Sequence, residues 1–513
     1  MVTYSSFVVI ALYVLITILI SYLVNNRYNK GGDFSTGGKQ FGWFTAGVSI
    51  LATYISAMTF VGMPGWVYRS GMEAMSIHLN YPIVIFFTVI FFVPVFYKLG
   101  LTSIYEYLEH RFGVYARTIN SIVFIVVQCI SAGVILYAVA LILVQVLPIS
   151  ISEAIIYISI FTACYTYAGG ISTVIWTDML QSAVLVAGSI AIFAILMTEI
   201  NAADYLSRDH LNIINLDFDL GVDTTLWAGV VAVSFLHLSV YGTNQLIIQR
   251  TLATRCEKTA QKSMLLCGYG AFFVYLFFAV LGVLLSVFYQ DQSFENSNEV
   301  ILDFVFNHTN PIVVGLIISA LAAAAMSTLD STYNSMATVA TFDIYKRFVR
   351  KSADDEHYEK VARKMSLLAA AMVVVPALLA VSNESVLKTI ASLTSIFVGI
   401  RLGSFVLGLF WAKANEKGVI VGSIMSVIAV FTAMYLDVAW PWFAPIGTFV
   451  FLLFGVLVSR RWGAVTAEQQ IFINNQKHLF AKPTASHYGL LVFAVATIAA
   501  CMVLPDWLYA ALS

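Results

Sequence analysis

The stretch "LATYISAMTFVGMPG", residues 51–65, combines membrane-like hydrophobicity with residues that weaken a helix. It lies in an apolar run from about residue 42 to 68, yet it contains three hydroxyl side chains (Thr53, Ser56 and Thr59), two glycines and a proline. Unwound backbone inside a membrane is tolerated only where it is buried in protein or lines a wet cavity, and there its free carbonyl oxygens can coordinate a cation. We therefore interpret this stretch as an interrupted helix that forms a binding site. A packing kink is the alternative.

The composition indicates a membrane protein. Of the 513 residues, 60% are hydrophobic and 11% are charged, whereas a soluble domain has about 25% charged residues. A membrane span needs about 20 mostly apolar residues. The sequence predicts an all-α polytopic membrane protein with about 14 transmembrane helices. They lie at about residues 5–25, 42–68, 74–98, 116–147, 151–169, 172–200, 225–250, 261–290, 309–342, 362–382, 387–412, 417–436, 440–459 and 486–508.

The charges predict how the chain crosses the membrane. The first span has no Lys or Arg before it and no small-residue cleavage site after it, so we interpret it as a retained helix that begins outside. Alternating the spans then places most of the 27 Lys and Arg residues on the inner side, with Arg69, Arg208 and Lys388 outside, as the positive-inside rule expects. We predict a multi-pass protein of the cell inner (plasma) membrane, in contact with the lipid bilayer and with both termini outside. The oligomeric state stays open.

No polar stretch is long enough for a separate soluble domain, and the chain has no GxxxxGK[ST] motif. ATP is therefore not expected to drive its activity. No nucleophile and base pair or metal cluster emerges, so we expect no enzyme activity, and we expect no nucleic-acid partner.

A second interrupted segment, "LHLSVYGTNQ" at residues 236–245, lies in the span five helices after the first. Interrupted segments at corresponding positions of two halves indicate an inverted-repeat transporter, with the binding site at the interruptions. An odd number of helices per repeat inverts the second copy. The two interruptions together favour a site over two packing kinks.

The span at 309–342 carries a polar face suited to a cation. Five residues spaced by three, four and seven share one side of the helix: Ala324, Ser327, Thr328, Ser331 and Asn334. Asp330 stands beside them. Hydroxyl and carbonyl oxygens suit a hard monovalent cation, and no His or Cys indicates a transition metal. The alternative is a face that packs against another helix.

Two carboxylates and one guanidinium lie deep in the predicted spans. Burying an unpaired charge costs several kcal/mol, so such residues are functional, paired or neutralised. A cation between Asp178, Asp330, Ser327 and Ser331 would compensate both carboxylates; a buried ion pair or a protonated acid is the alternative. Arg401 stays charged, so it either binds an anionic substrate or pairs with Asp178, Asp330 or helix-end carbonyls.

Four motifs resemble the sodium:solute symporter family: "FYKLGLTSIYEYLEHRFG" (96–113), "YAGGISTVIWTDMLQ" (167–181), "YGTNQLIIQRTLA" (241–253) and "SALAAAAMSTLDSTYNSMATVATFDIYKRF" (319–348). The resemblance extends from the first span to about residue 413. It implies a bacterial member with a LeuT-type 5+5 inverted repeat and sodium-driven uptake. The implied organisation is an extra N-terminal helix at 1–30, a first repeat at 42–200, a second repeat at 225–413 and C-terminal helices at 417–513.

The resemblance also implies ion ligands, with Na+ as the coupling ion. The family's main sodium site corresponds to the carbonyls of Ala52, Ile55 and Ala324 and the hydroxyls of Ser327 and Thr328. A second sodium site, present in some members, corresponds to Asp178, Ser327, Asp330 and Ser331. Asp330 replaces the hydroxyl usual at its position, which either strengthens the site or makes it sensitive to protons.

Substrate positions follow from the same resemblance. The sugar pocket of galactose-transporting members corresponds to Thr59, His78, His237, Ala271 and Ala391, and its amide, carboxylate and lysine contacts are missing here. Each histidine is otherwise a hydrogen-bonded structural residue. Ser56 and Thr59 match the hydroxyls that hold the acid group in sialic-acid-transporting members. Their arginine is replaced by Ser131, for which Arg401 is the candidate substitute.

Other stretches of the sequence, including "GVILYAVALIL" (133–143), resemble the branch that carries iodide, monocarboxylates and vitamins. We expect alternating-access symport of sodium and a small organic solute into the cell, the solute being a small organic anion such as a monocarboxylate or sialic acid. The alternatives are a sodium-coupled neutral sugar symporter, a passive channel and a transporter-like membrane sensor.

Overall fold

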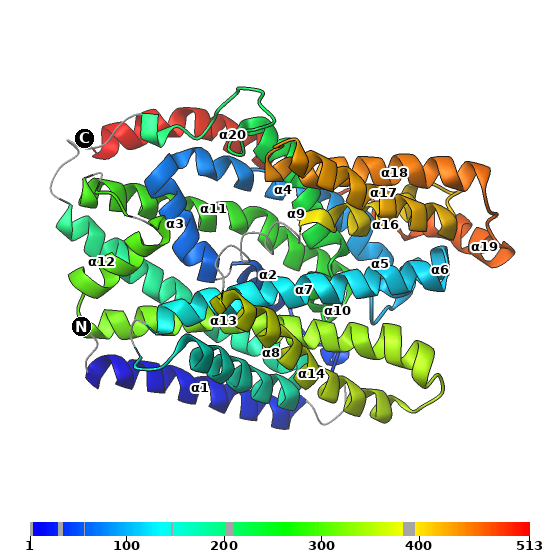
Figure 1. Ribbon diagram of the computed structural model, residues 1–513, viewed down its shortest axis with the longest axis horizontal. Coiled ribbons are helices and arrows are strands. Elements are labelled where there is room, and N and C mark those ends of the chain that lie inside the picture. The colour runs from blue at the N-terminus through cyan, green and yellow to red at the C-terminus, as the bar shows by residue number, and fades with distance from the viewer. Residues whose placement is uncertain are drawn as a thin grey trace.

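The apolar segments of the chain form long helices, because a helix satisfies its backbone hydrogen bonds internally where no water is present. The computed structural model describes residues 4–28, 34–55, 57–144, 147–200, 209–290, 292–294, 296–382 and 395–512. Most of these residues are helical, and one isolated β-bridge joins Phe41 to Thr254. Most of the long helices run in a common direction, as helices that cross one bilayer do (Figure 1).

The helices have the following bounds. The first half of the chain forms α1 (Tyr4–Tyr28), α2 (Trp43–Tyr54), α3 (Ala57–Ser70), α4 (Tyr81–Phe87), α5 (Val93–Leu99), α6 (Tyr105–Arg111), α7 (Val114–Leu143), α8 (Ile151–Glu199), α9 (Val233–Thr243) and α10 (Gln245–Leu252). The second half forms α11 (Glu257–Tyr289), α12 (Val300–His308), α13 (Pro311–Val339), α14 (Asp355–Ser382), α16 (Val398–Phe410), α17 (Glu416–Tyr435), α18 (Phe443–Arg461), α19 (Ala467–Gln476) and α20 (Ala485–Leu512).

Ten of the described helical segments are long and apolar enough to cross a membrane, and two bent helix pairs each make a further span. The segments predicted at 151–169 and 172–200 form the single element α8, whose 49 residues would measure about 74 Å if straight. A bilayer core is about 30 Å thick. Gly170 divides α8 with non-helical dihedrals (φ 55°, ψ −154°), so the two predicted spans remain distinct. The all-α polytopic fold is confirmed.

The first interruption lies at Ile55, within the stretch 51–65 where the sequence predicts it. The helix α2 ends at Tyr54, Ile55 leaves the helical region (φ −81°, ψ 89°), and the axis bends by 55° before α3. Pro64, one of the helix-weakening residues of this stretch, does not end a helix, because it lies inside α3. Gly65 serves packing instead: a Cβ there would lie 2.4 Å from the backbone oxygen of Ser297.

The second interruption is also confirmed. The helix α9 ends at Thr243, and Asn244 is extended (φ −110°, ψ 121°). Its side chain accepts a hydrogen bond from the Leu246 N–H at 3.0 Å, which caps the start of α10. The helical segments Trp227–Thr243 and Gln245–Leu252 meet at a bend of 45°.

The helix α13 forms the centre of the bundle. Every side chain from Ala323 to Val339 is buried, and α13 packs against α1, α2, α7, α8 and α14. A helix that is buried on all sides must let its neighbours approach closely, which small side chains permit. The alanines and hydroxyls of this segment therefore lie in the protein interior.

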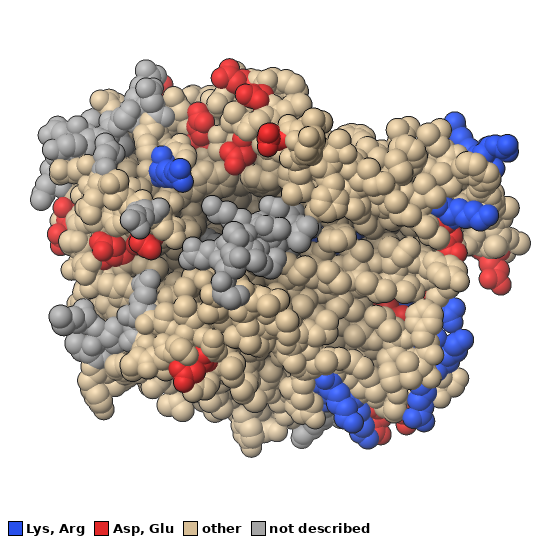
Figure 2. All heavy atoms as spheres, in the orientation of Figure 1, with Lys and Arg blue, Asp and Glu red and all other residues tan. Residues whose placement is uncertain are grey.

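Charge is distributed unevenly along the bundle. Figure 2 shows most of the visible Lys and Arg side chains at one end of the molecule, where α14 begins and α18 ends. The helix α1 begins and α20 ends at the opposite end (Figure 1). The two ends of the described chain therefore lie on the side away from the basic surface.

Candidate functional site

The break after α2 exposes backbone oxygens to α13. The last carbonyls of a helix have no donor in the following turn. Leu51 still accepts a hydrogen bond from the Ile55 N–H at 2.8 Å. The Ala52 carbonyl oxygen instead lies 3.2 Å from the Ser327 hydroxyl, and that of Thr53 lies 3.5 Å from the Thr328 hydroxyl.

The Ala324 carbonyl completes this group of oxygens. It lies 3.0 Å from the Ser327 hydroxyl and 3.3 Å from the Thr328 hydroxyl. Four residues predicted at the first sodium site are thus brought together, and the fifth, Ile55, is buried at the break itself. Neutral carbonyl and hydroxyl oxygens are chemically suited to a hard monovalent cation.

A charged cluster lies one helical turn further from the break. Asp178 on α8 is fully buried and accepts a hydrogen bond from the Ser49 hydroxyl at 2.5 Å. It pairs with Arg250 of α10 at 3.4 Å. Arg250 also donates to Ser49 at 2.9 Å, to the Leu246 carbonyl at 2.6 Å and to the Ser331 hydroxyl. Hydrogen bonds from Arg250 to Ser49, Leu246 and Ser331 therefore hold the ion pair in place.

Asp330 joins the same cluster from α13. It is fully buried and accepts hydrogen bonds from Tyr165 at 2.8 Å, Ser331 at 3.1 Å and Thr177 at 3.4 Å. Ser331 links this carboxylate to Arg250. With both carboxylates ionised, the described part of this cluster would carry one negative charge more than Arg250 balances, and a bound cation would compensate it.

The sequence predictions above do not include Arg250 in the site; it is the last residue of the predicted span at 225–250. Its side chain is 0% exposed, so it is part of the site and not a topology determinant. Arg250 lies on α10, five residues after the end of the second interrupted segment (236–245). A signal was available: Asp178 required a buried cationic partner, and Arg250 is the first basic residue after the second interruption.

The predicted substrate residues divide into two groups. Thr59, His78 and His237 meet at an aromatic cluster: the ring of His78 stacks on Tyr275 at 3.5 Å, that of His237 stacks on Tyr81 at 4.5 Å, and Thr59 lies near the Tyr275 side chain. His237 also makes a 2.6 Å hydrogen bond with the Asn80 side chain, and His78 a 3.3 Å bond with Tyr81. Ser56 and Ala391 lie outside the described residues.

Arg401 lies apart from that cluster, in a cavity lined by α2, α7, α9, α13 and α16. Its predicted pairing with Asp178 or Asp330 is wrong, because those carboxylates bind Arg250 and Tyr165 instead. Ser131 lines the same cavity. Ser131 and Arg401 therefore line the same cavity, as they must if Arg401 takes the place of the arginine that is Ser131 here.

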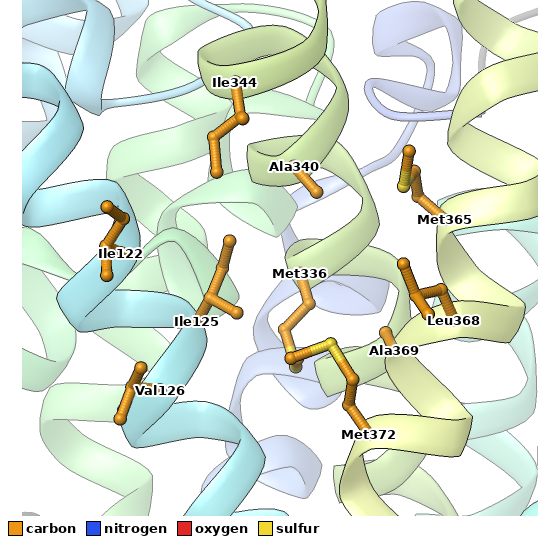
Figure 3. A pocket seen from close by; sticks show the side chains of 10 residues that line it. All are labelled: Ile122, Ile125, Val126, Met336, Ala340, Ile344, Met365, Leu368, Ala369 and Met372. Carbon is orange, nitrogen blue, oxygen red and sulfur yellow. The ribbon is translucent and has the colours of Figure 1, made fainter.

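A separate cavity of about 260 Å³ lies between α7, α13 and α14 (Figure 3). Its lining side chains are aliphatic or methionine, and three of them are Met336, Met365 and Met372 (Figure 3). It offers no side-chain oxygen or nitrogen among its lining residues, so it is not a suitable ion site.

Comparisons with known proteins place the chain in a family. Residues 34–426 match the profile of the sodium:solute symporter family. The human sodium/iodide cotransporter is 31% identical over 414 residues, which are 78% of this chain and 64% of that protein. The sodium/sialic acid symporter of Proteus mirabilis is 28% identical over 470 residues, which are 87% of this chain and 93% of that protein.

A solved structure agrees with the sequence matches. The substrate-bound, outward-open structure of a Na+-coupled sialic acid symporter has a TM-score of 0.84 at 26% identity, and the match covers 90% of this chain and 99% of that one. The predicted LeuT-type fold and Na+ as coupling ion are thereby confirmed. The chain belongs to the sodium:solute symporter family and is a multi-pass, sodium-coupled solute symporter.

Proposed function

We propose that this symporter carries a small organic anion into the cell together with sodium, by alternating access. The observation that carries the proposal is the contact between the Ala52 carbonyl and the Ser327 hydroxyl, 3.2 Å apart, because it joins a broken helix to the buried centre of the bundle. The anionic class is supported by two relatives whose names specify iodide and sialic acid. These solutes differ greatly in size and share a negative charge.

Sodium at the first site has a mechanical role in this proposal. Coordinated by Ala52, Ile55, Ala324, Ser327 and Thr328, it ties α2 to α13 at the level of the break. Release of the ion to the inside removes that tie and lets α2 move away from α13. Loss of sodium to the inside therefore loosens the pocket and lets the solute leave.

A second sodium at Asp178, Asp330 and Ser331 accounts for the unbalanced charge of the cluster. Each net charge moved across the membrane contributes about 2.3 kcal/mol per 100 mV. Two sodium ions with one monoanion carry one net positive charge inward, so a negative interior favours uptake. One sodium with one monoanion is electroneutral and gains nothing from the potential.

Neutral sugar symport is the second candidate function. The stacked rings around His78 and His237 favour it, because aromatic faces suit the apolar faces of a sugar ring. Thr59 belongs to this cluster and is the proposed hydroxyl contact for a sugar there. The anionic proposal differs in requiring a cationic partner for the solute.

Uptake into proteoliposomes tests the proposal. An inward sodium gradient should drive accumulation of a carboxylate such as propionate, pyruvate or sialic acid above its external concentration. Galactose serves as the neutral comparison. Equal uptake with potassium or with protons alone would contradict sodium coupling at the proposed sites, uptake of galactose alone would replace the anionic class, and transport that never exceeds equilibrium would indicate a passive channel.

A further inference from the structure

Arg401 is a buried cation with unused hydrogen-bonding capacity. Its side chain is 3% exposed, and two of its guanidinium nitrogens, Nε and Nη1, have no hydrogen-bond partner in the described structure. A guanidinium cannot discharge by losing a proton. Leaving a buried charge unpaired costs several kcal/mol, so a missing partner is indicated.

The other deeply buried arginines are fully bonded. Arg111 donates to the carbonyls of Gly408, Ala414 and Trp411 at 2.7–3.0 Å. Arg117 pairs with Asp343 and Glu109, and Arg250 with Asp178 and its neighbours. Arg401 is the exception among these four. Its unpaired nitrogens are thus a local feature and not a general property of buried arginines in this protein.

The partner would lie in the cavity that Arg401 lines, which measures about 220 Å³. Its polar lining is neutral, from Gln128, Ser131, Asn244 and Thr332, and no acidic side chain faces it among the described residues. The rest is largely aliphatic, including Ile135 and Val240. One positive charge, several neutral hydrogen-bonding groups and an apolar wall fit a carboxylate with a short carbon chain.

The same cavity adjoins the first sodium site. Thr328 lines it, and so does Thr53, whose carbonyl lies 3.5 Å from the Thr328 hydroxyl. Tyr54, which also lines it, contacts the ring of His237 on its other side. A ligand in this cavity would therefore touch the helix α2 directly before its break, where sodium is proposed to bind.

We propose that the Arg401 cavity is the carboxylate-binding subsite of this symporter, and that its ligand is a monocarboxylate of a few carbon atoms. The inference rests on the proposed anionic substrate and deepens it. Pockets for drug-sized ligands measure about 300–1,000 Å³, so about 220 Å³ favours a compact acid over a nine-carbon sugar acid. The aliphatic wall favours an organic carboxylate over an inorganic anion.

A binding comparison with matched probes tests the proposal. Propionate and its neutral isostere propionamide are titrated against purified protein in sodium, with thermal unfolding as the readout. Wild type should bind propionate at least about tenfold more tightly than propionamide, as loss of a charge-assisted hydrogen bond implies. Arg401→Gln should abolish that preference, and Arg401→Lys should retain part of it because it keeps the charge without the planar fork.

A second variant keeps the test independent of folding. Ser131→Glu places a carboxylate inside the cavity, where it can pair with Arg401 and replace the ligand. It should raise the unfolding temperature and remove the response to propionate. Ser131→Gln has nearly the same shape as Ser131→Glu without the charge, so the propionate response that it retains beyond that of Ser131→Glu measures the effect of the charge alone.

Several results would overturn the proposal. They are an unchanged preference for propionate in Arg401→Gln, an undiminished response in Ser131→Glu, stabilisation of wild type by iodide or by sialic acid alone, and no stabilisation by propionate. Sodium-driven anion uptake by Arg401→Gln with an unchanged KM would reject this subsite while leaving the proposed function intact. Absence of anion uptake by wild type would reject the proposed function itself.

Discussion

The hydroxyl of Ser327 lies 3.2 Å from the carbonyl oxygen of Ala52, although the two residues are 275 positions apart in the chain. This contact joins the end of α2 to the middle of α13. It forms where α2 stops at Tyr54, and the last carbonyls of a helix generally have no donor within the helix. The sodium proposal depends on this relationship.

Breaking the buried ion pair should destabilise the protein strongly. Arg250→Gln leaves two buried carboxylates without their cation and should cost about 3–5 kcal/mol, whereas Asp178→Asn leaves Arg250 with Asp330, linked through Ser331, and should cost less. The double variant removes both charges, so its loss should be smaller than the sum of the two single losses. Thermal unfolding of the four proteins in detergent measures this coupling, and strictly additive losses would show that Asp178 and Arg250 do not act as a pair.

Replacing Asp330 should change the number of sodium ions that uptake requires. Asp330→Asn keeps the shape of the side chain and removes the negative charge that we assign to the second ion. The sodium dependence of uptake should become less steep, and the current carried per transported anion should fall. Asp303→Asn, which alters a carboxylate on α12 beside Tyr289, is the control. Equal steepness in Asp330→Asn and wild type would remove Asp330 from the second site.

A methyl group at Gly65 should disturb the packing of α3 against the segment that contains Ser297. Its Cβ would lie 2.4 Å from the Ser297 backbone oxygen, a contact that backbone cannot easily relieve. Gly65→Ala should therefore lower stability by about 1–3 kcal/mol. Gly62→Ala is the matched control on the same helix, because its Cβ meets only the Asn298 side chain at 3.8 Å. Similar unfolding temperatures for both variants would refute the packing role of Gly65.

Both termini should be accessible from outside the cell. The basic surface lies at the opposite end of the bundle from the start of α1 and the end of α20 (Figures 1 and 2), and basic residues favour the inner side. A short tag added after Ser513 should be labelled by an impermeant reagent in intact cells. Labelling only after permeabilisation would reverse the orientation.

The oxygens proposed to bind sodium could be predicted because their sequence signals are local. A run of helix-weakening residues marks the break near Ala52, and hydroxyls at helical spacing mark the buried face of α13. Each pattern is readable within a few turns of one helix. Their contact across the bundle then followed from the inverted-repeat interpretation and the family resemblance.

The ion pair between Asp178 and Arg250 could not be read in this way. The two residues are 72 positions apart, and a basic residue near the end of a predicted span is normally assigned to the surface. Pro64 was misleading too, because it lies within the helix α3 and does not mark the break. The aromatic partners of His78 and His237 likewise depend on tertiary packing, for which their own positions carry no periodic signal.

The sodium dependence of uptake by Ser327→Ala/Thr328→Ala tests the central claim most directly. This double variant removes both hydroxyls from the proposed first site, and Ser319→Ala, a buried hydroxyl of α13 bonded to its own helix at Gly315, is the control. The sodium concentration for half-maximal uptake should rise about tenfold or more in the double variant, since each lost ligand contributes on the order of 1 kcal/mol. It should stay near the wild-type value in the control. A double variant with wild-type sodium dependence would contradict a sodium ion held between α2 and α13.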